Sequence, residues 1–186
     1  MSERDQDRRP PEAAALRQRH AARAESAAAR AAALSHYIER RGSAAESEDS
    51  TARAEAAWKS AHAARVAAGA LAVIAESAPD PAADSRCARN AAASAAQAAR
   101  MGRLVDGDTE PSVAACTAAL TASLAASAAA GAGHLGANAA LNAEADDTEK
   151  HAVAAAERAG WIQPGEKIPS VSTGVRSGEV MSMMHL

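Results

Sequence analysis

The sequence predicts an all-α protein, namely an antiparallel bundle of about four long, alanine-rich helices with flexible N- and C-terminal tails. Alanine supplies 58 of the 186 residues and is the best helix former, because it loses no side-chain entropy on folding. Leu, Ile, Val and Phe together supply only 21 residues, a level typical of disordered chains, but the net charge of −3 is much smaller than such chains carry. Proline and glycine residues divide the alanine-rich sequence into segments of helical length.

A core made of alanine stabilises a fold less than one made of leucine. Each buried CH₂ group contributes about 0.8 kcal/mol, and an alanine side chain has few such groups to bury. We therefore expect a protein partner or self-association to supplement the core. Arginine outnumbers lysine 17 to 3 and phenylalanine is absent. Codon usage in a GC-rich genome produces the same bias, so part of the composition carries no functional meaning.

Three regions are predicted: a disordered N-terminal arm (1–11), a helical bundle (12–160) and an extended or partly disordered C-terminal tail (161–186). The first helix should follow Pro10 and Pro11, since proline suits the start of a helix, and should end near Arg41, with Gly42 just beyond it. Ser43 and Glu46 form a capping-box pattern. They predict that a second helix begins at that point and ends before residue 79.

The third and fourth helices are expected on either side of a turn at residues 102–108. Asp80 can cap the third helix, which should reach about Met101. The fourth begins near Pro111, and no charged residue occurs from there to Ala143, a run of 33 positions. A helix without a charged face is normally surrounded by others, so we expect this one to be the central helix. Asp146 and the residues after it could cap a short fifth helix ending at residue 160, or the fourth could continue through them.

A membrane-spanning helix is the alternative interpretation of the uncharged run. Only five Leu or Val residues occur in it before Asn142, and these are the residues that drive insertion into a bilayer. We therefore do not expect a membrane partner. The charged N-terminus leads into no apolar segment of the kind found in signal peptides, which predicts a cytoplasmic location.

His134, Asn138 and Asn142 form the strongest polar cluster in the sequence. They are spaced four residues apart and therefore line one edge of a helix. Polar side chains on a core stripe cost free energy unless they are hydrogen-bonded. The cluster could line a ligand pocket between helices or an interface where amide pairs fix the register. The simplest alternative is that the bundle opens to solvent at this end.

The other motifs that could carry chemistry lack the context that the chemistry needs. Gly131, Gly133 and Gly136 match the dinucleotide-binding pattern, but the preceding residues indicate a helix rather than a strand, so we interpret them as sites of close helix approach. The histidines do not have the spacing of helical metal sites. Cys87 and Cys116 lie among small residues and are expected to be small apolar side chains. The sequence therefore predicts no catalytic residue, no metal site and no cofactor.

These observations favour a non-catalytic interaction or structural protein that acts through alanine-lined helix faces, in one form as a homo-oligomer. One alternative is a small-molecule-binding or enzymatic bundle that uses His134, Asn138 and Asn142. A second is a nucleic-acid-associated protein that uses the first helix, because residues 1–41 hold nine arginines. Six acidic residues are interleaved with those arginines and weaken the positive field, so nucleic acid is not the expected partner.

Overall fold

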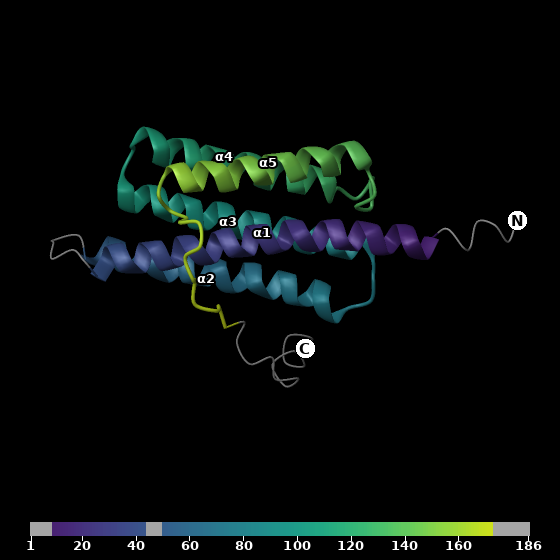
Figure 1. Cartoon of the computed structure of the whole chain (residues 1–186), viewed down its shortest axis with the longest axis horizontal. Coiled ribbons are helices and arrows are strands. Elements are labelled where there is room, and N and C mark those ends of the chain that lie inside the picture. The colour runs from purple at the N-terminus through teal and green to yellow at the C-terminus, as the bar shows by residue number, and fades with distance from the viewer. Residues whose placement is uncertain (1–8, 44–49, 173–186) are drawn as a thin grey trace, which may run out of the picture.

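The structure, a computed structural model, describes residues 9–43 and 50–172. Within them the chain forms five α-helices and no strand (Figure 1): α1 (Arg9–Ser43), α2 (Ser50–Glu76), α3 (Pro81–Asp106), α4 (Glu110–Ala129) and α5 (Ala139–Arg158). The predicted all-α bundle is confirmed. Most of the predicted N-terminal arm, the capping residue Glu46 and the end of the predicted C-terminal tail lie outside the described residues.

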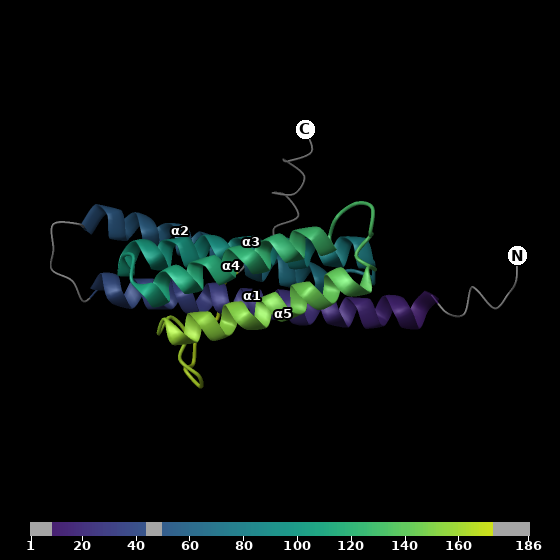
Figure 2. The same ribbon diagram turned by 90° about the horizontal axis from the view of Figure 1, so that it is seen from above.

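The helices are stacked so that α3, not α4, is the central one. α3 packs against α1, α2 and α4, whereas α4 packs against α3 and α5, and α5 reaches only the edge of α1 (Figures 1 and 2). The prediction that the uncharged segment after Pro111 is central was therefore wrong. The physical reason is the small size of the side chains that α3 buries, which lets three neighbouring backbones approach it closely; they include Ala88, Ala91, Ala92, Ala95, Ala96, Ala98 and Ala99.

Several helix ends differ from the predicted ones. Asp80 caps α3 as expected, and its side chain accepts hydrogen bonds from the backbone of residues 82 and 83. α1 continues through Gly42 to Ser43, so Ser43 does not cap α2. Asn138 caps α5, which places Asp146 inside that helix rather than at its start. A turn at 130–138 separates α4 from α5, so the fourth helix does not continue into the fifth.

Trp161 is the largest fully buried side chain in the described chain. Its indole nitrogen donates a hydrogen bond to Asp106 at 2.6 Å, and its ring packs so closely on Gly102 that a Cβ there would lie 3.1 Å from it. Residues 161–172 form no helix and pass from the end of α5 across α1 towards α2 (Figure 1). The tryptophan anchors this segment to the end of α3.

In α4 the larger apolar side chain is exposed and the small ones are buried, which is the reverse of most amphipathic helices. Its buried side is made of small residues, while Leu124 is 71% exposed. Small side chains allow α3 and α5 to approach the α4 backbone, and leucine would hold them further away. Among the described residues, α4 is the one helix long and apolar enough to cross a membrane, and half of its most apolar window is buried inside the bundle.

Candidate functional site

Long polar side chains fill the space between α1 and α5. The Arg23 guanidinium pairs with Asp146 at 2.7 Å, and Arg19 also binds that carboxylate. Two turns further along, Arg30 pairs with Glu149 at 2.7 Å, and both side chains of this pair are almost completely buried. We call this set of contacts the polar seam. It comprises Arg19, Arg23, Ser26 and Arg30 of α1 with Asn142, Asp146 and Glu149 of α5.

The polar seam ends at a buried histidine. The Nε2 atom of His20 lies 3.0 Å from the carbonyl oxygen of Gly136; because a carbonyl only accepts, Nε2 carries the proton. The Asn142 side chain donates to the same carbonyl at 2.9 Å. Burial, and then the nearby charge of Arg23, lower the pKa of His20 from 6.5 to about 4. The imidazole is therefore neutral at physiological pH and acts as a hydrogen-bond donor that holds the turn between α4 and α5.

His20 should make the fold sensitive to acid. Its pKa is lower in the folded state, about 4, than in the unfolded chain, 6.5, so unfolding takes up a proton between these values. The corresponding stability is present above pH 6.5 and is lost as the pH falls towards 4, by about 3 kcal/mol in total. Urea unfolding of wild type and His20→Gln at pH 7 and pH 4.5 checks this, because glutamine keeps a donor without titrating. The wild type should lose more stability than the variant; an equal loss would contradict the assignment.

The structure separates the three residues of the predicted polar cluster. Asn142 is fully buried in the polar seam, where its oxygen accepts from Arg23 at 3.2 Å. Asn138 caps α5 by accepting from the backbone of Leu141. His134 is exposed in the turn. The spacing of four placed them on one helix edge, but only Asn142 belongs to α5 proper, so the three side chains do not form a common pocket.

The arginines of the polar seam are the polar residues that the sequence analysis missed. The arginines of the first helix are considered above only as a source of positive surface charge, whereas Arg23 and Arg30 are both buried. They are seven residues apart and alternate with Ala27 and Leu34 at helical spacing, a pattern that places all four on one stripe. Asn142 and Glu149 of α5 are also seven apart. This matching seven-residue spacing in the two helices was the sequence pattern from which the polar seam could have been predicted. Because these guanidiniums bind carboxylates of α5, they are not free to contact phosphates.

The glycine pattern lies in the turn between α4 and α5, outside any strand-to-helix junction. Of its members, Gly136 has a φ of +73°, and a Cβ there would lie 2.2 Å from the carbonyl oxygen of Pro81. Gly133 faces open space. A Cβ at Gly131 would lie 3.1 Å from the carbonyl oxygen of Ala128 in the preceding helix. The closest packing is at Gly136, where the turn presses against the start of α3. The interpretation of these glycines as sites of close approach holds for Gly136 in particular.

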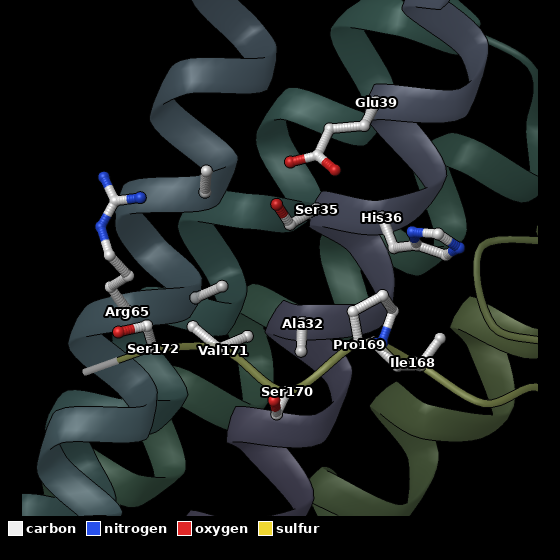
Figure 3. Close-up of a pocket in the computed structure, with 12 residues that line it drawn as sticks. Ala32, Ser35, His36, Glu39, Arg65, Ile168, Pro169, Ser170, Val171 and Ser172 are labelled. Carbon is white, nitrogen blue, oxygen red and sulfur yellow. The ribbon is translucent and has the colours of Figure 1, made fainter. Parts of the chain in front are cut away.

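A cavity of about 230 Å³ lies between α1, α2 and the segment after α5 (Figure 3). Its polar side chains include Ser35, His36 and Glu39 of α1. Glu166, in the segment after α5, pairs with Arg40 of α1 at 2.8 Å. Ser35 and His36 are neighbours in sequence, so they point in directions about 100° apart on the helix and cannot form a nucleophile–base pair. The cavity therefore offers hydrogen-bonding groups from α1 and from the segment after α5, including the hydroxyls of Ser170 and Ser172.

The two cysteines are free, and Cys116 is buried. Burial raises the pKa of the Cys87 thiol above its usual value, and the carboxylate of Asp84 acts in the same direction. A raised pKa keeps the thiol protonated and a poor nucleophile. Both features fit the expectation that the cysteines act as small apolar side chains.

Beyond Glu110 at the first position of α4, the surface of α4 that faces away from the bundle has no charged side chain. We call it the α4 outer face; its exposed residues are Ala114, Thr117, Thr121, Leu124, Ser127 and Ala128. Each of the three hydroxyl groups donates to a carbonyl oxygen one turn earlier in α4, at 2.9 to 3.0 Å. The hydrogen-bonding capacity of these donors is therefore used within the helix. This exposed face therefore has few free donors for hydrogen bonds to water, although the helix is about 30 Å long.

No family model, curated protein or solved structure matches this chain.

Proposed function

We propose that this chain is a non-catalytic interaction protein that self-associates through the α4 outer face. The observation that supports this most strongly is the exposure of Leu124, at 71%, on a helix face that has no charged residue after Glu110 at its start. Surface helices of monomeric proteins usually direct charged residues outward, and apolar exposed faces mark interaction sites. The polar residues of this face hydrogen-bond within α4, so covering them costs little desolvation.

The weak core gives a physical reason for association. Almost all of the buried apolar side chains are alanines, and each contributes little on burial. A homo-oligomer would bury a second apolar layer over α4 and stabilise the folded state by mass action. The titratable groups of the polar seam are already engaged with one another, which favours a structural role for them over a catalytic one.

The proposal is tested by the molar mass in solution. We expect the wild type to be a dimer or larger species by light scattering at micromolar concentration, and Leu124→Glu to be a monomer, because a buried unpaired carboxylate is strongly unfavourable at an interface. Val66→Glu is the matched control. Val66 is exposed on α2, which lies on the opposite side of the bundle from α4 (Figure 1), so that variant should keep the wild-type mass.

A monomeric wild type over the whole concentration range would overturn the proposed function. Far-UV circular dichroism of each variant shows whether the helices remain, so that loss of association is not confused with unfolding. An equal loss of association in Leu124→Glu and Val66→Glu would move the interface away from α4.

A further inference from the structure

Ser35 differs from the other buried serines of the described chain, because its hydroxyl has no partner there. Ser60 and Ser85 donate to carbonyl oxygens three residues earlier, at 2.9 and 3.0 Å, and Ser112 does the same at 3.0 Å. Ser35 is only 6% exposed, yet its hydroxyl makes no hydrogen bond with any residue that the structure describes. Buried polar groups normally have a partner, so this hydroxyl indicates either a water molecule or a ligand.

The Ser35 hydroxyl points into the cavity between α1, α2 and the segment after α5 (Figure 3). With a volume of about 230 Å³, this cavity has room for about seven water molecules. It is smaller than the pockets that bind drug-sized molecules, so it suits one small organic molecule. Such a ligand gains affinity when it displaces poorly ordered waters and satisfies the same polar groups.

The segment after α5 is fixed in place as one wall of this cavity. We call residues 161–172 the strap. Its start is anchored by the buried Trp161, Glu166 pairs with Arg40 at 2.8 Å, and Val171 packs against the hydrophobic core. The last five residues of the strap line the cavity. Because the strap is held at these three points, the wall is formed before a ligand arrives, and binding does not have to order it.

The cavity walls carry opposite charges. Glu39 lines the cavity from α1, with its carboxylate directed into the space beside Ser35, and Arg65 lines it from α2 (Figure 3). Arg65 makes no ion pair with any residue that the structure describes. Apart from His36, which lies 3.8 Å from Glu166, the rest of the lining consists of serine hydroxyls and small or aliphatic side chains. These apolar residues are Ala32, Ala61, Ala64, Ile168, Pro169 and Val171.

A small zwitterion matches these walls better than a ligand with a single charge. A carboxylate accepts hydrogen bonds from a guanidinium and from hydroxyls, whereas an ammonium group donates them to a carboxylate. An anion without an ammonium group would be repelled by Glu39, and a cation without a carboxylate would be repelled by Arg65. A short aliphatic chain suits the apolar part of the lining.

We propose that this cavity binds a free amino acid with a short aliphatic side chain. Its carboxylate pairs with Arg65, its ammonium group with Glu39, and one of these two groups hydrogen-bonds to the Ser35 hydroxyl. The site goes beyond the proposed function, because the cavity is formed by α1, α2 and the strap, whereas self-association is proposed for α4. The two proposals therefore stand or fall separately.

Titration of the full chain with L-alanine, L-valine and L-leucine, followed by amide NMR shifts, tests the proposal. The signals of residues 32–39, 61–65 and 168–172 should shift to saturation, with a dissociation constant in the millimolar range or tighter, while those of α4 should not move. Isobutylamine and isovalerate are valine without its carboxylate and without its ammonium group. Each should bind about ten-fold more weakly than valine, or not at all.

Two variants test the assigned contacts. Ser35→Ala should raise the dissociation constant about three-fold or more, and Arg65→Gln about ten-fold, because the first loses one hydrogen bond and the second a charge-assisted contact. Ser60→Ala is the control for Ser35→Ala, since Ser60 is buried but its hydroxyl donates within α2. Arg86→Gln is the control for Arg65→Gln, since Arg86 is exposed on α3. Both controls should bind as the wild type does, and circular dichroism checks that each variant is folded.

Three results would overturn the proposal. If none of the three amino acids shifts the cavity signals, the cavity holds only water. If isovalerate binds as tightly as valine, Glu39 does not recognise an ammonium group and the ligand class is wrong. If Ser35→Ala weakens binding no more than Ser60→Ala does, the ligand does not lie against Ser35. None of these results changes the molar mass on which the test of association through α4 depends.

Discussion

Glu149→Ala is expected to lower the free energy of unfolding by about 3–5 kcal/mol, the usual cost of removing one partner from a buried ion pair. Glu149 accepts from Arg30 at 2.7 Å and from Ser26 at 3.0 Å, and alanine would leave the Arg30 guanidinium buried without a counter-charge. For a domain of ordinary stability, about 5–15 kcal/mol, this is a large fraction. Urea denaturation followed by circular dichroism measures it.

Two further variants identify the cause of that loss. Asp147→Ala removes an acidic residue of the same helix whose ion pair with Lys150 is exposed, and it should cost less than about 1 kcal/mol. Arg30→Met/Glu149→Leu replaces both charges with apolar side chains and should be more stable than Glu149→Ala alone, because no unpaired charge remains buried. If Glu149→Ala were as mild as Asp147→Ala, the polar seam would not hold α5 against α1.

Gly136→Ala should destabilise the fold by about 3 kcal/mol or more, through backbone strain and a steric clash together. The glycine has a φ of +73°, and a Cβ there would lie 2.2 Å from the carbonyl oxygen of Pro81. Backbone atoms of the α3 start cannot move away without breaking the cap that Asp80 provides. The turn that carries the acceptor for His20 and Asn142 would shift instead, which would also loosen the polar seam.

Gly133→Ala is the matched control for that substitution. Gly133 lies in the same turn, and a Cβ there would meet nothing within 4 Å. Alanine in open space should change stability by less than about 1 kcal/mol, and in the favourable direction if it restricts the unfolded chain. Thermal unfolding of the two variants measures the difference. Similar melting temperatures would show that the turn does not press on Pro81.

The helices themselves were predictable from local residues. Alanine favours a helix at every position that it occupies, and Asp80 with Pro81 starts α3 as expected because both act on the first turn alone. The ends that were predicted wrongly involve longer-range contacts. α3 extends past Met101 to Asp106, where Asp106 binds Trp161 and Tyr37. α5 begins at Ala139 and is capped by Asn138, close to the buried carbonyl of Gly136.

The candidate site was only partly predictable. Asn142 lies on a predicted core stripe where a polar side chain needs partners, and in the structure it hydrogen-bonds to Arg23 and Gly136. His134 shares the predicted spacing but is exposed, because the turn at 130–138 ends the helix before it. A spacing of four residues places side chains on one edge only within an unbroken helix. The glycine-containing turn between α4 and α5 interrupts the helix, so the spacing rule does not apply across it.

Local residue preferences are enough to specify an all-α bundle, the positions of its main breaks and a core of small side chains. Which helix is central, the burial of Arg23 and Arg30 and the outward orientation of Leu124 follow from packing between helices instead. The reason is that an alanine-rich helix has little contrast between its faces, so hydrophobic periodicity does not select the one to bury. Close approach of backbones and the few paired charges select it instead, and both depend on neighbours that are distant in the sequence.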